Sequence, residues 1–180
     1  GIRVLYTSPK HNWQFWTEPQ TELNNRKIYI PRGKVVGGSS AINSMIAIRG
    51  NPQDYDSWEA QGCRGWGYEN LRPYLRKIED AAQVTSQPDQ DRGHSGPIRL
   101  SYGVLQHPIS KALIESAKSA GLPENNGFNG PSQMGAGFYE LTISDGKRSG
   151  AFKFLDQGKG RSNLTIMANT QVRRLAVEGT

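Results

Sequence analysis

Residues 32–50 read RGKVVGGSSAINSMIAIRG, and this stretch carries the strongest structural signal in the chain. An apolar pair, Val35-Val36, meets two adjacent glycines and two serines, and a run of small, helix-compatible residues follows. Paired glycines let the backbone take positive φ and let a ligand approach it closely. Amides exposed at such a turn, or at a following helix start, bind anions or polar rings. The glycines alone leave a plain turn and a ligand-binding loop both open, but no Gly-Lys-Ser/Thr follows them, which excludes a P-loop.

The composition gives no specific signal for nucleic-acid binding. The 180 residues carry a net charge of +6, and the length predicts one domain or two. Basic residues gather before the glycines, at Arg26, Lys27, Arg32 and Lys34, and acidic residues gather between positions 54 and 91. A basic face attracts nucleic acid, but no nucleic-acid motif and no regular interleaving of basic and aromatic residues accompany it. We therefore expect no nucleic-acid partner.

Cysteine, histidine and hydropathy patterns indicate neither a disulfide nor a metal site. The single cysteine, Cys63, excludes an internal disulfide. The three histidines lie in polar or capping contexts, and no Cys/His set has the spacing of metal ligands. No apolar run approaches the length that crosses a bilayer, and no signal peptide is visible. The location stays unknown, with the cytoplasm and a membrane-associated state as the two expectations.

Helix signals recur along the middle of the chain. Asn51 caps and Pro52 opens a helix that we expect to end before Gly62. A second helix is expected over residues 69–81, and a third from His107-Pro108 to Gly121. The buried face of the third helix is expected to hold Ile109, Leu113, Ile114 and Ala117. Residues 83–95 are polar and predict a loop, which is a candidate domain boundary or lid.

Strand and turn signals fill the remainder. Asn24-Asn25 and Asp145-Gly146 predict turns, the second of the hairpin type. A short helix is expected to end near Leu155. Strands are expected at residues 28–30, 96–101, 138–143, 164–168 and 172–177. From the residues alone, this pattern indicates an α+β chain with a ligand-ready glycine loop.

The full stretch from Arg32 to Gly50 resembles the signature of the glucose–methanol–choline (GMC) oxidoreductases, a family of flavin enzymes. That signature consists of a basic residue, an apolar pair, Gly-Gly-Ser-Ser, an apolar position, Asn and a downstream Arg-Gly. The resemblance spans nearly the whole chain and is greatest to the choline dehydrogenase and alcohol dehydrogenase branch. It continues through DYDSW at 54–58, GWGY at 65–68, FNG at 128–130, QMGAGF at 133–138, DGKRS at 145–149 and NLTI at 163–166.

This resemblance implies an α+β/α/β fold: part of a two-domain flavoprotein in which an FAD-binding α/β domain is interleaved with a sheet-plus-helices substrate domain. Residues 1–50 and 159–180 would belong to the FAD-binding domain, residues 51–95 would form covering helices and a loop, and residues 96–158 would belong to the substrate-binding domain. Family members are several times longer, so we expect an internal fragment. The Gly-x-Gly-x-x-Gly segment would precede it, and the catalytic histidine would follow it.

The resemblance also implies which residues contact a non-covalent FAD. Val35 and Gly38 would offer backbone contacts, and Ser39 would face the phosphate and linker region. Asn43, with the backbones of Ser44, Met45 and Ile46, would sit at the isoalloxazine ring, where N–H donors stabilise the charge of a reduced flavin. Val172 would contact the adenine through its backbone. Some members link FAD covalently through a histidine just before the asparagine, but this chain has Ile42 there.

The implied activity is oxidation of the CH–OH group of an alcohol, choline-like or an alkanol, with hydride transfer to flavin N5. No catalytic residue is assigned in this chain, because the family's histidine lies outside it. The substrate, the oligomeric state and the electron acceptor, quinone or oxygen, stay open. Two alternatives remain: a lyase that keeps FAD without net redox chemistry, and a non-catalytic binding relative. We expect the isolated 180 residues neither to hold FAD tightly nor to turn over.

Overall fold

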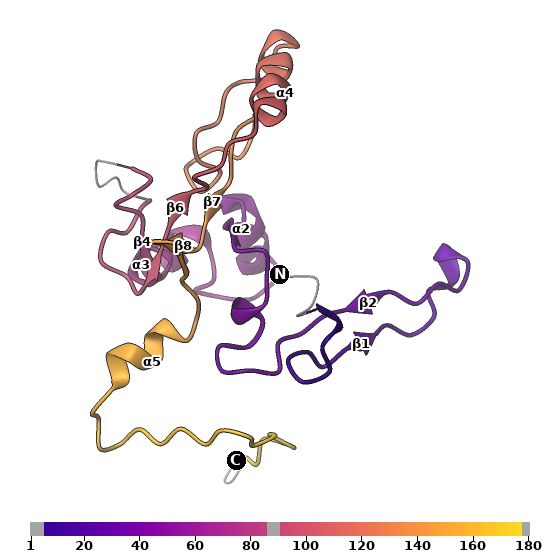
Figure 1. Cartoon of the computed structure of the whole chain (residues 1–180), viewed down its shortest axis with the longest axis vertical. Helices are drawn as coiled ribbons and strands as arrows, with labels where there is room; N and C mark the ends of the chain where they lie inside the picture. Colours follow the sequence, from indigo (N-terminus) through magenta and orange to yellow (C-terminus); the bar gives the residue numbers. More distant parts are fainter. Residues whose placement is uncertain (1–5, 86–90, 178–180) are drawn as a thin grey trace.

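The computed structural model describes residues 6–85 and 91–177 as an open, elongated chain (Figure 1). A hairpin arm projects to one side, small sheets lie in the middle, and helix α4 lies at the far end from the C-terminal segment. The accessible surface is 13435 Å², whereas a compact monomer of 19.9 kDa exposes about 8,700 Å². Much of the apolar surface is therefore uncovered.

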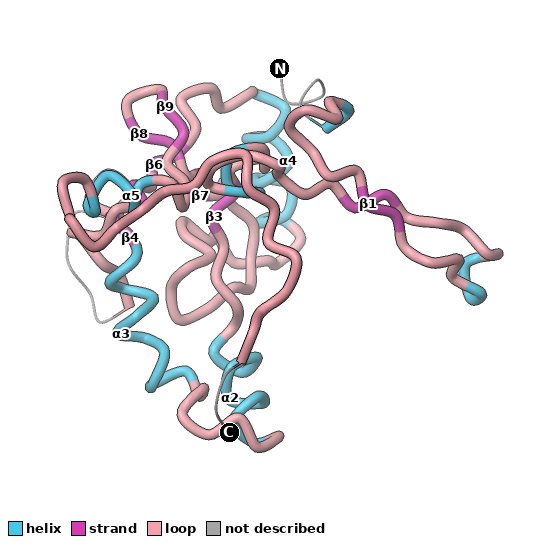
Figure 2. Tube along the Cα trace, turned by 90° about the horizontal axis from the view of Figure 1, so that it is seen from below, coloured by secondary structure: helices cyan, strands magenta, loops and turns pink. Residues whose placement is uncertain are grey.

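The arm is a two-stranded antiparallel ribbon of β1 (Phe15–Trp16) and β2 (Tyr29–Ile30). Its tip carries the 3₁₀ turn η1 (Thr21–Leu23), and Asn24 and Asn25 follow in the left-handed region at φ 56° and 58°. Asparagine tolerates this region better than most residues, and the predicted turn is confirmed. Figure 2 shows the arm extending well away from the sheets and helices.

The central sheet has the order β3-β7-β6 and is antiparallel, with β3 (Ile46–Ala47), β7 (Glu140–Leu141) and β6 (Ser101–Tyr102). Beside it, β4 (Glu79–Asp80) pairs in parallel with β5 (Ile98–Arg99). A hairpin of β8 (Ile143–Ser144) and β9 (Lys147–Arg148) turns at Asp145-Gly146, where φ is 52° and 70°. Two consecutive left-handed residues match a type I′ turn and confirm this prediction.

The run after the serines is not helical, which corrects the helix-compatible prediction. A 3₁₀ turn, η2 (Gly38–Ala41), is followed directly by β3. Met45 lies between them at φ 64°, a left-handed conformation that ends any helix. The Met45 carbonyl instead accepts a hydrogen bond from Thr142 N at 2.7 Å, beside the central sheet.

Helix α2 (Pro52–Ala60) begins where the sequence predicts. The Asn51 side chain accepts from Gln53 N at 3.1 Å, and Asp54 accepts from Asn51 N at 2.8 Å. This reciprocal pair is a capping box, which satisfies amides that the first turn leaves without partners. Gly62, at φ 104°, follows the end of the helix as expected.

Helix α3 (Tyr68–Ile78) ends before the predicted residue 81. Glu79 leaves the helix for β4, and its side chain, buried in the interior, accepts from Gly93 N at 2.8 Å. The predicted loop at 83–95 falls partly on residues 86–90, outside the described residues. Its final part is not a surface loop, because Arg92 is only 5% exposed.

Helix α4 (Pro108–Ser119) is capped by His107, whose Nδ1 accepts from Ile109 N at 3.2 Å. The predicted buried face is wrong for Ile109 and Leu113, which are 73% and 70% exposed. The amphipathic spacing is present, but no described segment packs on that face closely enough to bury these two side chains. The short final helix, α5, spans Lys153–Gly158 and so extends beyond Leu155.

The two strands predicted at 164–168 and 172–177 do not form. Residues 162–177 contain turns and irregular backbone without a strand, and Leu164, Val172 and Leu175 are 40%, 76% and 88% exposed. A strand is stabilised only by pairing with a neighbour. Among the described residues, no strand lies along this segment to pair with it.

Candidate functional site

The glycine turn has one closed side and one open side. Gly37 and Gly38 have φ values of 88° and 56°, so the predicted left-handed turn is confirmed. A Cβ on Gly33 would lie 2.2 Å from the Gly38 carbonyl oxygen, which shows how closely the backbone folds on itself. A Cβ on Gly38 would meet nothing within 4 Å. The space beside the Gly38 Cα is therefore open, whereas the Gly38 N–H already donates to the Val35 carbonyl at 2.8 Å.

A segment more than a hundred residues later, 148–152, clamps this turn. Arg148 Nη1 donates to the Ser40 carbonyl at 3.1 Å, and Ala151 N donates to Ser40 Oγ at 2.9 Å. Ser40 Oγ in turn donates to the Gly37 carbonyl at 2.6 Å. Phe152 packs over Gly37 so closely that a Cβ there would lie 2.9 Å from Phe152 Cδ1. The turn is thus held by main-chain and side-chain contacts from the β8–β9 hairpin and the start of α5.

The Asn43 side chain is anchored at one end. Its Oδ1 accepts from Arg148 Nη1 at 2.5 Å and from Met45 N at 3.1 Å. Asn43 N also donates to the Ser39 carbonyl at 2.9 Å. Ser39 and Ser44 are exposed on either side of Asn43. The chain therefore presents a fixed amide between two exposed hydroxyl-bearing residues.

A buried ionic cluster, formed by Arg49, Glu79, Arg92 and Glu140, supports the far end of β3. Arg92 donates to both oxygens of Glu140, at 2.7 and 2.6 Å, and its Nε lies 3.0 Å from Glu79 Oε1. Arg49 Nη2 lies 2.6 Å from the same Glu79 oxygen. Burial alone lowers the pKa of Arg92, but hydrogen bonds to Glu140 and Glu79 outweigh it and raise that pKa above its ordinary value.

Asn129 ties this cluster to the signature stretch. Its Nδ2 donates to Glu140 Oε2 and to the Ala47 carbonyl, both at 2.9 Å, and its Oδ1 accepts from Arg49 N at 2.7 Å. Sequence reasoning missed the cluster, because nothing in the spacing marks Glu79, Arg92 and Glu140 as partners. The one available signal was Asn129 and Arg49, which both lie in motifs of the resemblance.

The sequence profile of the family described as GMC oxidoreductase matches residues 9–180. The chain belongs to the GMC oxidoreductase family. It is 41% identical over 172 residues to the mitochondrial choline dehydrogenase of Homo sapiens, covering 95% of this chain and 28% of that protein. It is 37% identical over 174 residues to the oxygen-dependent choline dehydrogenase of Vibrio vulnificus, covering 95% of this chain and 30% of that protein.

A solved structure of pyridoxine 4-oxidase from Mesorbium loti matches this GMC chain with a TM-score of 0.88 and 34% identity. The match covers 99% of this chain and 35% of that one. The chain therefore spans about a third or less of the length of these relatives. GMC oxidoreductases are FAD-binding flavoprotein oxidoreductases. Nothing in these comparisons supports the lyase alternative.

The loop of this GMC chain fits a polar, planar cofactor such as FAD. The space beside the Gly38 Cα is open, and a side-chain amide stands at Asn43 with its oxygen end already bound. The structure brings together seven of the predicted contact residues, which lie along one short, bent stretch: Val35, Gly38, Ser39, Asn43, Ser44, Met45 and Ile46. It does not bring Val172 to them through a strand, because that residue lies in the unpaired C-terminal segment.

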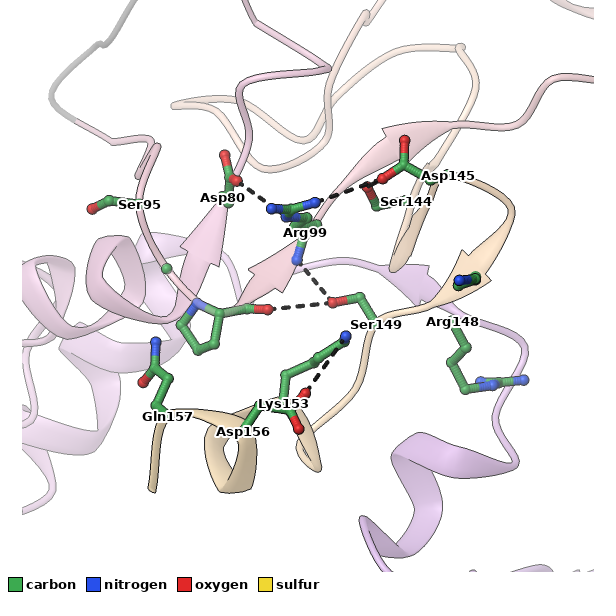
Figure 3. Close-up of a pocket in the computed structure, with 13 residues that line it drawn as sticks. Asp80, Ser95, Arg99, Ser144, Asp145, Arg148, Ser149, Lys153, Asp156 and Gln157 are labelled. Carbon is green, nitrogen blue, oxygen red and sulfur yellow. Dashed lines mark hydrogen bonds and ion pairs between the residues drawn. The ribbon is translucent and has the colours of Figure 1, made fainter. Parts of the chain in front are cut away.

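A hollow of about 520 Å³ lies next to the clamp, lined by charged residues of β5, the β8–β9 hairpin and α5. Figure 3 shows Arg99 between Asp80 and Asp145, at 3.8 and 3.6 Å, whereas Arg148 extends away from these side chains. Most of the charges in this hollow pair with one another. Among the described residues, no group of three or more His, Cys, Asp or Glu side chains is placed to hold a metal ion, and no described helix is long and apolar enough to span a membrane.

Proposed function

We propose that this chain supplies the flavin-contacting loop of an FAD-dependent oxidoreductase that acts on the CH–OH group of an alcohol. The observation that carries the proposal is the clamped turn at Gly37-Gly38, which leaves the space beside the Gly38 Cα open and is followed by the anchored amide of Asn43. Family membership supports FAD as the cofactor. Two of the similar proteins are named for choline, an amino alcohol, and one for pyridoxine. A choline-like or alkanol substrate is therefore the substrate class that we propose.

We assign the contacts along the loop as follows. Val35 and Gly38 would offer backbone contacts, Ser39 would face the phosphate and linker region, and Asn43 would lie at the ring system. The backbones of Ser44, Met45 and Ile46 would continue that surface, and the Val172 backbone would contact the adenine. The same proposal divides the chain into domains. Residues 1–50 and 159–180 would belong to the FAD-binding domain, residues 51–95 would form covering helices and a loop, and residues 96–158 would belong to the substrate-binding domain.

Bound FAD would supply the hydride acceptor, at flavin N5. The contribution of this chain is electrostatic and positional, because oriented N–H donors aimed at developing negative charge stabilise the reduced state without reorganising. Ile42, 3% exposed, has no nucleophilic atom and points into the interior. That position cannot form a covalent bond to the cofactor, so we propose non-covalent FAD.

The test is anaerobic reduction of the FAD-loaded holoenzyme by choline and by a series of alkanols, followed by flavin absorbance. We expect the oxidised flavin band to bleach with at least one of these alcohols, and Asn43→Ala to slow the bleaching. Oxygen is then added to one sample of reduced enzyme and a quinone to another. The electron acceptor is the compound that restores the absorbance band of the oxidised flavin. A purified protein without FAD, or an FAD band that no alcohol bleaches, contradicts the proposal; the second result favours the non-catalytic alternative.

A further inference from the structure

The hydrogen bonds of Asn43 determine which end of its amide faces Arg148. A guanidinium group has only donors and no acceptor, and Met45 contributes a backbone N–H. Two donors therefore converge on one atom of Asn43, which must be the carbonyl oxygen Oδ1. The usual ambiguity between the oxygen and nitrogen of an asparagine side chain is absent here, because the reversed amide would place NH₂ against two donors.

The opposite end of the amide is available. Among the residues that the structure describes, Nδ2 of Asn43 has no hydrogen-bond partner, and Asn43 is half-buried rather than fully solvated. We infer that Arg148 is a positioning residue that orients the Asn43 amide so that its NH₂ end, and not its carbonyl, faces the flavin. This inference rests on the proposed FAD-binding function of the loop.

Arg148 is held firmly enough to act in this way. It ends the β8–β9 hairpin, whose type I′ turn fixes the strand direction, and its Nη1 also donates to the Ser40 carbonyl at 3.1 Å. The next residue, Ser149, is 2% exposed and donates from its backbone N to the Thr142 carbonyl at 2.8 Å. Ser149 Oγ further accepts from Arg99 N at 2.9 Å. The guanidinium thus projects from a fixed backbone onto the loop.

The orientation has a redox consequence. An amide NH₂ next to the negative charge of a reduced ring stabilises the reduced form, whereas a carbonyl in that place destabilises it. Without Arg148, Met45 N is the single remaining donor to Oδ1, so the amide is held less firmly and can rotate to offer either end. Arg148→Met should therefore weaken binding of reduced relative to oxidised FAD by about tenfold, which lowers the two-electron midpoint potential by about 30 mV.

The experiment measures the midpoint potential of flavin in FAD-loaded holoenzymes that carry Arg148→Met, Asn43→Ala or both changes. We expect each single change to lower the potential and the double variant to match Asn43→Ala, because Arg148 acts through that amide. Arg148→Lys keeps a donor and should retain a potential near that of the unchanged protein. Arg99→Met is the matched control, since Arg99 lines the same hollow and pairs with Asp80 and Asp145 instead; its potential should not change.

Arg148→Gln replaces Arg148→Met if the latter does not retain FAD, because a glutamine amide offers both donor and acceptor and cannot impose an orientation. Two results together overturn the inference: a folded, FAD-loaded Arg148 variant has the potential of the unchanged protein, and Asn43→Ala has a lowered potential. The proposed function is left intact by that outcome. Additive shifts in the double variant overturn it as well. An unchanged potential in Asn43→Ala removes Asn43 from the flavin contacts, and the inference fails with that assignment.

Discussion

Arg92 is a buried cation in the interior of this chain. Its side chain is 5% exposed and lies between two carboxylates, Glu79 and Glu140, that come from different strands. Removing a charged group from water is costly, and the cost is recovered only when opposite charges and hydrogen bonds surround it. Here all three ionised groups are paired, and Asn129 adds a further donor to Glu140. The cluster therefore ties β4 and β7 together where an apolar core is nearly absent.

Replacing Glu140 by glutamine tests this role. We expect Glu140→Gln to destabilise the holoenzyme by about 3–5 kcal/mol, the range for breaking a buried ion pair, because Glu79 is shared with Arg49 and cannot neutralise both guanidinium groups. The measurement is the midpoint of denaturant unfolding. Glu115→Gln is the control: Glu115 also pairs with a cation, Lys118, but on the surface of α4. Equal midpoints for the two variants contradict a structural role for the cluster.

At the scale of elements, the parts with local signals were predictable. Helix α2 begins at its capping box and the β8–β9 hairpin turns at Asp145-Gly146, because neighbouring residues alone determine both. Elements that depend on distant partners were not. Helix α3 stops at Ile78, where Glu79 turns to pair with Arg92, and residues 164–168 form no strand because no described strand pairs with them.

The candidate site also has features that the sequence predicts and features that it does not. The turn at Gly37-Gly38 could be predicted from glycine chemistry, and the FAD contacts from the family resemblance. Neither could show that Arg148 reaches Asn43, because the two residues are 105 positions apart. Local sequence specifies the conformation of the loop, whereas the fold specifies which side chains orient it.

The packing of α5 on the glycine turn gives a prediction at this scale. Gly37→Ala should destabilise the protein and weaken FAD retention, because a side chain at φ 88° is strained and its Cβ would lie 2.9 Å from Phe152. Left-handed strain alone costs roughly 1–2 kcal/mol. Gly121→Ala is the control for backbone strain without a steric contact, because Gly121 has φ 91° and a Cβ there would meet nothing within 4 Å. Thermal unfolding should show the larger loss for Gly37→Ala, and equal losses would mean that the Phe152 contact contributes nothing.

At the scale of the whole molecule, polar contacts hold the chain together more than apolar burial does. The buried apolar residues in the described part are Ile42, Ala81 and Leu100. A hollow of about 560 Å³ between α4 and the segment around Phe128 is lined mainly by apolar residues. Large exposed apolar surfaces mark sites that contact other protein segments, a membrane or a ligand. In the described residues, the glycine loop is held by polar contacts and by Phe152, and its exposed side chains include Ser39 and Ser44.

This architecture predicts how the 180 residues behave on their own. Burial of apolar surface supplies most of the free energy of folding, and the arm, the outer face of α4 and the C-terminal segment leave much of that surface in water. We expect the isolated chain to unfold at low denaturant concentration without a sharp transition and to lose FAD on dialysis. The FAD-loaded holoenzyme, dialysed in parallel, should keep its flavin absorbance. Flavin retained by the isolated chain would contradict this prediction and show that the loop and its clamp suffice for binding.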